Sequence, residues 1–213
     1  MTTTPDPLRF MAPEASSRGI YEYLSTWFPQ TGSLLDLGCG AGGFLDFAKT
    51  RGLTVSGVDT DHGNAERCRV RGLNVVEGDV FSTLSSADRS YDVVSLIHVV
   101  EHFSPEDASR LVKSAARVLT EGGSLLIVTP NFADPTVNGH IFWLDPTHLR
   151  PYPLPLLADL CVASGLEVTS ASTEVLVNLG RRRALVRPLQ RLRHGREFER
   201  SNAVLVARRP NTN

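Results

Sequence analysis

Cysteine, lysine and long apolar runs are scarce in this chain of 213 residues, and each shortage narrows the class of protein. The three cysteines, Cys39, Cys68 and Cys161, are too few and too scattered for a disulfide framework or a C-x-x-C metal site. Because no long apolar run and no signal peptide are visible, we expect a soluble, cytoplasmic protein without a membrane segment. At 41% hydrophobic residues the chain can bury one core, so we expect a single domain over residues 1–213.

The basic residues are unevenly distributed. Only 2 are Lys, and 8 of the 20 Arg lie between Arg181 and Arg200, where Glu197 and Glu199 leave a net charge of +6. Since the net charge of the whole chain is −1, the residues outside this stretch carry a net charge of −7. We interpret the insert over residues 178–200 first as a solvated amphipathic connection or homodimer element, and second as a wall of an acceptor groove. Nucleic-acid binding is least favoured, because only Phe198 places an aromatic ring among the arginines.

The most informative feature present is an apolar run that ends in a carboxylate and a glycine loop, LLDLGCGAGG from Leu34 to Gly43. It predicts a buried strand that turns sharply into a helix, with backbone N–H groups left free to face a ligand. The spacing G-x-G-x-x-G also fits a dinucleotide. Asp36, two positions before Gly38, and the spacing G-x-G-x-G that ends at Gly42 favour S-adenosylmethionine. A carboxylate there can receive an ammonium group, whereas it would repel a pyrophosphate.

Three further strands follow in the order expected of an α/β protein. Residues 54–58 predict a strand that ends at Asp59, where a carboxylate can hold two ribose hydroxyls. A short strand precedes Gly78-Asp79, and residues 91–98 predict a fourth strand. From about Gly32 to Pro130, and more weakly to the C-terminus, the chain resembles the class I S-adenosylmethionine-dependent methyltransferases.

This resemblance implies a cofactor site and a fold. In that family the position of Asp79 commonly contacts the adenine, and the end of the fourth strand lies against the methionine. The expected cofactor-binding residues are Asp36, Gly38, Cys39, Gly40, Gly42, Asp59, Thr60, Asp79, Val80 and His98. The implied fold is α/β, a Rossmann-like doubly wound sheet of about seven strands whose last strand, residues 202–208, is antiparallel.

The rest of the sequence alternates between helical and strand patterns. Helices are predicted over residues 14–28, from Ser104 to Gly122-Gly123, and over residues 155–164, with strands over residues 124–129 and 166–176. We expect residues 1–31 to form an N-terminal helical lid beside the cofactor.

Ionisable side chains gather after the fourth strand, where sheets of this kind bind their ligands. His98, Glu101 and His102 come within reach of one another if a helical turn starts at His98. The segment is similar to the Glu-x-x-Glu-His of ubiquinone-pathway O-methyltransferases and small-RNA 2′-O-methyltransferases, whose acidic and His positions hold a divalent metal. A purely structural role, in which Glu101 and His102 orient loops, is equally open.

The resemblance implies His98, Glu101, His102 and His148 as metal ligands, with His140 as the alternative to His148. Because His98 replaces the first Glu of the pattern, the preferred ion shifts from Mg²⁺ toward Mn²⁺, Co²⁺ or Zn²⁺.

A second constellation lies in the long segment 130–153, which we expect to be the acceptor loop. Its run from Asp145 to Tyr152, DPTHLRPY, is similar to a segment of bacterial methyltransferases of glycan assembly, which act on sugar hydroxyls. Asp145, His148 and Arg150 are expected to bind hydroxyls. Phe142, Trp143 and Tyr152 are expected to stack on sugar rings, or in part to close an apolar lid over the cofactor.

The leading hypothesis is an O-methyltransferase of a sugar hydroxyl on an oligosaccharide, polysaccharide or glycolipid. Its catalytic residues would be His148, as general base or metal ligand, with His102, Glu101 and Asp145. A phenolic or quinone-type acceptor is the alternative. An NAD-binding dehydrogenase and a non-catalytic cofactor-binding module are more remote hypotheses.

Overall fold

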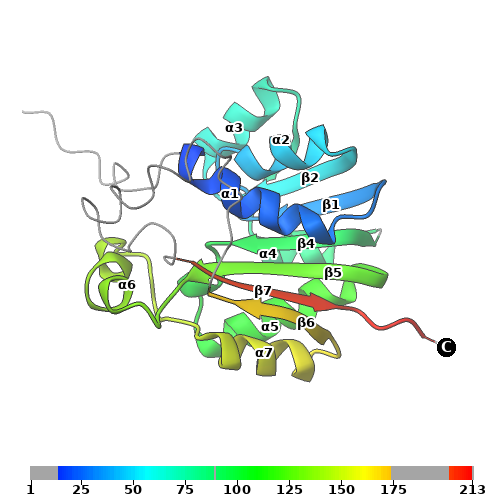
Figure 1. Ribbon diagram of the computed structural model, residues 1–213. Coiled ribbons are helices and arrows are strands. Elements are labelled where there is room, and N and C mark those ends of the chain that lie inside the picture. Colours follow the sequence, from blue (N-terminus) through cyan, green and yellow to red (C-terminus); the bar gives the residue numbers. More distant parts are fainter. Residues whose placement is uncertain (1–13, 89, 174–201, 213) are drawn as a thin grey trace, which may run out of the picture.

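The computed structural model describes residues 14–88, 90–173 and 202–212. Its centre is a seven-stranded sheet in the order β3-β2-β1-β4-β5-β7-β6 (Figure 1). The strands are β1 (Gly32–Leu37), β2 (Leu53–Asp59), β3 (Asn74–Glu77), β4 (Tyr91–Ile97), β5 (Leu119–Pro130), β6 (Glu167–Ser172) and β7 (Asn202–Arg208). Neighbours from β3 to β5 pair in parallel, while β7 is antiparallel to both β5 and β6. The predicted doubly wound sheet with an antiparallel last strand is confirmed.

Helices cover both faces of this sheet, so its central strands are buried over long runs, residues 93–96 in β4 and residues 123–129 in β5. One face carries α1 (Glu14–Leu24), α2 (Gly43–Thr50) and α3 (His62–Val70), and the other carries α4 (Val80–Ser85), α5 (Pro105–Arg117) and α7 (Leu154–Ala163) (Figure 1). Each layer encloses its own apolar core: Leu34 and Phe44 lie in the first, and Leu96 and Leu111 in the second. No helix within the described ranges is long and apolar enough to cross a membrane.

The helix after Ser104 is shorter than the sequence predicts. Ser104 caps α5 by accepting a hydrogen bond from the Asp107 amide at 3.1 Å, and the helix ends at Arg117 rather than at Gly122-Gly123. The chain then enters β5 directly at Leu119. The pairing of β4 with β5 shifts between Tyr91 and Val93, and Gly122 with φ 71° supplies the left-handed conformation inside this irregular stretch.

The other predicted elements appear with small changes of boundary. The first helix ends at Leu24 and continues as a 3-10 turn, Ser25–Trp27, and the helix predicted over residues 155–164 is α7. The strand predicted over residues 166–176 is β6, with its last three predicted residues outside the described part of the chain. Residues 1–13 of the predicted lid and the whole insert 178–200 also lie outside the described residues.

The strand order reverses direction at β1, which places a topological switch point at the edge of the sheet formed by the carboxyl ends of its parallel strands. The chain moves outward from β1 to β2 and β3 and then returns to β4 on the other side of β1. The segments that leave β1 and β4 therefore diverge, and ligands bind at such a switch point. The segment after β5 lies at this edge as well, and contains the short helix α6 (Pro135–Gly139) and the 3-10 turn η4 (Ile141–Leu144) (Figure 1).

Candidate active site

The glycine loop after β1 needs glycine for two reasons. Gly38, Gly40 and Gly42 have φ of 73°, 53° and 80°, a left-handed conformation that other residues rarely adopt. A Cβ on Gly38 would lie 2.7 Å from Val99 Cγ2, because the loop passes close to the segment that follows β4. The loop is therefore held against the switch point of the sheet.

The amide groups of this loop do not face a ligand as the sequence predicts. The amides of Gly38 and Cys39 donate to the Val58 carbonyl at 2.8 and 3.0 Å, and the Gly40 amide donates to Asp59 Oδ2 at 2.7 Å. The Gly42 amide donates to the Cys39 carbonyl at 2.9 Å. The prediction is wrong for these four groups because the loop folds back on β2 and, at Gly42, on itself. With these donors engaged, the loop is poorly suited to a pyrophosphate.

Asp36 is a buried carboxyl at the same edge, with 2% of its surface exposed. Burial raises its pKa to about 7, although Ser95 Oγ, which donates to Oδ1 at 2.7 Å, favours the ionised form. The charge of Asp59 also raises this pKa. A cationic group placed beside Asp36 would therefore be strongly favoured. Ser95 was not among the predicted residues, although a polar residue inside the apolar strand YDVVSLI is a signal that could have found it.

The remaining predicted cofactor residues lie at the ends of β2 and β3. Asp59 accepts hydrogen bonds from the Asp61 amide at 2.9 Å and from Asn64 Nδ2 at 3.2 Å. Asp79 is exposed and caps α4 by accepting from the Phe81 and Ser82 amides, and its hydrogen bonds with Ser82 hold its pKa below the usual value. Of the other predicted residues there, Thr60 is exposed, whereas Cys39 and Val80 are each 8% exposed.

His98 directly follows β4 and has a left-handed conformation with φ 55°, which is unusual for a residue other than glycine. The predicted helical turn starts at Val100 rather than at His98, as the 3-10 turn η3 (Val100–His102). His98 Nδ1 still lies 3.1 Å from Glu101 Oε1, so the predicted contact between them is present. Strain of this kind is concentrated at functional sites.

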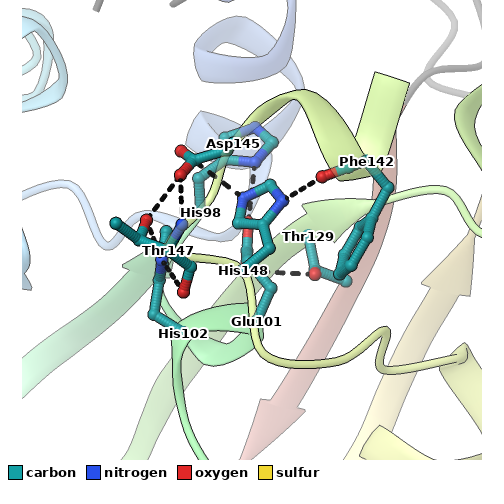
Figure 2. A network of polar contacts seen from close by, with 8 residues as sticks. All are labelled: His98, Glu101, His102, Thr129, Phe142, Asp145, Thr147 and His148. Carbon is teal, nitrogen blue, oxygen red and sulfur yellow. Dashed lines mark hydrogen bonds and ion pairs between the residues drawn. The ribbon is translucent and has the colours of Figure 1, made fainter. Parts of the chain in front are cut away.

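Glu101 is fully buried, and each of its carboxylate oxygens has a partner (Figure 2). Oε1 faces His98, and Oε2 accepts a hydrogen bond from Thr129 Oγ1 at 3.1 Å. Burial opposes ionisation, but the hydrogen bond and electrostatic interaction with His98 outweigh it and hold the Glu101 pKa below its usual value. Glu101 is therefore a buried carboxylate. Thr129, at the end of β5, is a contributor that the sequence analysis missed.

His102 and His148 lie next to each other although they are far apart in the sequence, with ring centroids 4.8 Å apart and ring planes tilted by 57°. His102 Nδ1 contacts the Thr147 carbonyl at 3.2 Å, and His148 Nδ1 contacts the Phe142 carbonyl at 2.7 Å (Figure 2). Asp145 Oδ2 lies 3.9 Å from His148 Nε2. All four predicted catalytic residues, Glu101, His102, Asp145 and His148, thus come together.

Three of these residues lie close enough together to hold a metal ion. One ligand atom each from Glu101, His102 and His148 lies within 4.8 Å of the other two, the one such group in the part of the chain that the structure describes. Two imidazoles and one carboxylate are a ligand set typical of Mn²⁺, Fe²⁺ or Zn²⁺. His98 contacts this group through Glu101 but is outside it, and His140, which directly follows α6, is outside it as well.

Comparison with known proteins identifies the domain. Residues 9–171 match the family model described as "Methyltransferase domain", which is well over half of the chain. The chain belongs to the class I S-adenosylmethionine-dependent methyltransferase domain family. S-adenosylmethionine is the cofactor of this family.

Individual relatives agree with the family assignment. The chain is 31% identical over 137 residues to a probable S-adenosylmethionine-dependent methyltransferase of Mycolicibacterium smegmatis, covering 63% of this chain and 52% of that protein. It is 30% identical over 104 residues to a ubiquinone biosynthesis O-methyltransferase of Idiomarina loihiensis, covering 46% of this chain and 42% of that protein. The chain thus spans about half the length of these curated relatives. A crystal structure of an S-adenosylmethionine-dependent methyltransferase from Archaeoglobus fulgidus has the same fold, with a TM-score of 0.75 at 22% identity over 95% of this chain and 97% of that one.

The aromatic residues of the segment after β5 divide into two groups in this methyltransferase domain. Phe142 and Tyr152 are each 1% exposed, so the prediction that they stack on a ligand is wrong. Phe142 packs on the His148 ring at 4.5 Å, and the Tyr152 hydroxyl donates to the Phe103 carbonyl at 2.8 Å. Trp143 is 58% exposed, with its indole N–H donating to the Asn138 carbonyl at 3.0 Å. Of the three rings, Trp143 is the one available to a ligand.

Proposed function

We propose that this chain is an S-adenosylmethionine-dependent O-methyltransferase that acts on a sugar hydroxyl of an oligosaccharide, polysaccharide or glycolipid. The observation that carries the proposal is the cluster of Glu101, His102 and His148 at the end of β4. A hydroxyl is a poor nucleophile at neutral pH until its proton is removed or its oxygen is polarised. A methyltransferase of hydroxyl groups therefore needs a base or a metal, and this cluster can supply either.

The residues at the glycine loop fit the cofactor. Asp36 is buried beside a loop whose amides are engaged, so the site favours a cationic ammonium over an anionic phosphate. Asp59, in its turn, would hold the ribose hydroxyls. When bound, S-adenosylmethionine supplies a methyl group on a positively charged sulfur, which keeps the electron pair of the broken bond. The site residues hold the acceptor oxygen in line with that methyl group.

His148 is the residue best placed to act as base. Because a carbonyl oxygen can only accept, the contact with the Phe142 carbonyl places the proton of a neutral His148 on Nδ1. Nε2 is then free to take the proton of the acceptor hydroxyl. Asp145, 3.9 Å from Nε2, stabilises the imidazolium that results.

The same three side chains would hold a divalent metal, and their chemistry fits one. Glu101 is a buried carboxylate, and both imidazoles have Nδ1 engaged by main-chain carbonyls. A bound metal would polarise the acceptor oxygen. Electron paramagnetic resonance of Mn²⁺ tests this part: wild type should bind the ion and Glu101→Gln should lose it. No binding by wild type at millimolar Mn²⁺ would leave the cluster with acid–base chemistry alone.

The sugar acceptor rests on the segment from Asp145 to Tyr152 and on the exposed Trp143 ring. An exposed indole is a suitable platform for a sugar ring, and Asp145 offers carboxylate oxygens to hydroxyl groups. The resemblance of DPTHLRPY to methyltransferases of glycan assembly supports the same class of acceptor.

A phenolic or quinone-type acceptor is the second candidate, and one observation favours it. The proposed acceptor loop exposes four apolar side chains in a stretch of nine residues: Ile141, Trp143, Leu144 and Leu149. Such a surface also suits an apolar acceptor. The ubiquinone biosynthesis O-methyltransferase among the relatives supports this class.

Acceptor tests separate the two candidates. Labelled S-adenosylmethionine would be supplied with mannosides and glucosides, partly methylated and unmethylated, beside catechols and short RNAs, with Mn²⁺ present. Label on a glycoside oxygen is the expected result. Label on catechols alone would support the second candidate, and label on RNA alone would overturn both.

A further inference from the structure

Main-chain carbonyls of one loop contact both imidazoles of the candidate site. His102 Nδ1 faces the Thr147 carbonyl at 3.2 Å, and His148 Nδ1 faces the Phe142 carbonyl at 2.7 Å. Since a carbonyl oxygen can only accept a hydrogen bond, each neutral imidazole carries its proton on Nδ1. Each Nε2 then keeps its lone pair for chemistry. The loop that includes η4 and His148 thus selects the tautomer of a histidine on η3 as well as its own.

Thr147 contacts His102 through its side chain as well as through its main chain. Its hydroxyl donates to Asp145 Oδ1 at 2.6 Å, and its amide donates to the same oxygen at 2.8 Å (Figure 2). Because the hydroxyl proton is directed at Asp145, Thr147 Oγ1 presents a lone pair to His102 Nδ1, 3.0 Å away. His102 therefore has two acceptors on one residue.

The position of Thr147 is itself fixed from both sides. The Leu149 amide donates to the Glu101 carbonyl at 2.9 Å, which attaches the loop to η3 beside the Glu101 carboxylate. On the other side, the His148 amide donates to the Asp145 carbonyl at 3.3 Å, which closes the turn around Thr147. The contact between Thr147 and His102 is thus part of the attachment of the loop to the end of β4.

We infer that Thr147 is the positioning residue of His102: its hydroxyl and carbonyl hold the imidazole with Nε2 directed to the site where the acceptor hydroxyl is activated. In this way, a hydrogen bond at one ring nitrogen fixes the tautomer and orientation of a histidine whose other ring nitrogen acts in catalysis or binds a metal. The inference rests on the proposed function for its catalytic meaning, but the tautomer is a property of the protein alone. The inference also means that the candidate site is complete only when this loop is attached to η3.

Nitrogen-15 NMR of histidine-labelled full-length protein tests the tautomer without any reaction. In wild type, neutral His102 and His148 should each show a protonated Nδ1 and an unprotonated Nε2, assigned with the variants His102→Gln and His148→Gln. Thr147→Val, which removes the hydroxyl at nearly constant shape, should shift His102 toward a mixture and leave His148 unchanged. Thr147→Ser should retain the wild-type pattern. A wild-type His102 protonated on Nε2, or a Thr147→Val spectrum identical to wild type, would overturn the inference.

Kinetics then tests the catalytic meaning with the acceptor found in the panel. Thr147→Val should lower kcat by about 10–100-fold, as loss of a partner that orients a catalytic imidazole does, with the Kd of S-adenosylhomocysteine unchanged. Thr147→Ser should recover most of kcat. Unchanged kcat in Thr147→Val would exclude the catalytic role. If wild type transfers methyl to no acceptor, the proposed function fails while the NMR result still decides the positioning role of Thr147.

Discussion

Asp36 is a carboxyl group buried where a charge is unfavourable, and its pKa shifts accordingly. Burial raises the pKa from 3.8 to about 7, so between these pH values the folded protein binds more protons at this position than the unfolded chain does. The contribution of Asp36 to stability is therefore full below pH 3.8 and is lost as pH rises toward 7. The buried carboxylate is suited to a cationic ligand, but its charge lowers the stability of the ligand-free protein.

Replacement of Asp36 by Asn should stabilise the ligand-free protein at pH 8. The neutral amide avoids burial of the charge, and the gain should be on the order of 2–4 kcal/mol, since one pKa unit corresponds to about 1.4 kcal/mol. Urea unfolding at pH 8 and pH 4.5 measures this effect, which should be much smaller at the lower pH. Equal stability of the two proteins at pH 8 would show that Asp36 does not carry a buried charge there.

Cofactor binding should favour the ionised form of Asp36, which the ligand-free protein disfavours. An ammonium group favours ionised Asp36, so the affinity for S-adenosylhomocysteine should increase between pH 6 and pH 8, with release of a proton on binding near pH 7. Calorimetry in buffers of different ionisation enthalpy measures that release. Asp36→Asn should lose both the affinity and the pH dependence. Retention of wild-type affinity by this variant would place the ammonium elsewhere.

Trp143 should act on the acceptor and not on the cofactor. Its exposed ring lies on the segment that carries His148, so Trp143→Ala should raise the KM for a glycoside acceptor by about tenfold, the loss of one aromatic contact. Trp143→Phe keeps a ring and should recover much of the difference, and neither variant should change the Kd of S-adenosylhomocysteine. An unchanged acceptor KM in Trp143→Ala would remove this ring from the acceptor site.

At the scale of elements, α5 connects the candidate site to the core. Its N-cap residue Ser104 lies two residues after His102, and the helix buries Leu111 and Val112 against the sheet. Ser104→Ala removes the cap of this helix and should destabilise the protein by about 1 kcal/mol in urea unfolding. Ser109→Ala, at an exposed position of the same helix, is the matched control and should have little effect. Equal effects of the two changes would mean that the cap contributes nothing.

Elements whose signal is local could be predicted from the sequence. The strand at residues 202–208 appears with the predicted bounds, because an apolar run buried on both faces is visible in composition alone. Its antiparallel direction could not be read from the residues and came from the family resemblance. The helix after Ser104 is predicted too long because nothing in the sequence before Gly122-Gly123 marks its end at Arg117.

Features that depend on contacts between residues far apart in the sequence could not be predicted in this way. The glycine spacing indicates the turn after β1, but not that its amides find the Val58 carbonyl and Asp59. Likewise, His148 was singled out by its motif, while its contact with His102 depends on the path of the loop through α6 and η4. Thr147 went unnoticed because its role exists only after the loop reaches the end of β4.

At the scale of the whole molecule, the sheet brings two unlike chemistries to one edge. The carboxyl ends of β1 and β2 provide the buried Asp36 and the partly buried Asp59, which suit the cationic and hydroxyl groups of the cofactor. The segments after β4 and β5 provide Glu101, His102 and His148, which suit an acceptor hydroxyl. The change in strand order between β1 and β4 places these two groups at one switch point of the sheet, as transfer between two bound molecules requires.

Single-turnover transfer of labelled methyl from S-adenosylmethionine to a glycoside, by wild type and by His148→Ala, is the most direct test of hydroxyl activation at this edge. Wild type should place the label on a sugar oxygen. His148→Ala should be slower by about 100-fold or more, because the base or ligand is gone, while its affinity for S-adenosylhomocysteine stays within about twofold of wild type. Equal transfer rates in the two proteins, or a large loss of cofactor affinity in the variant, would contradict the role given to His148.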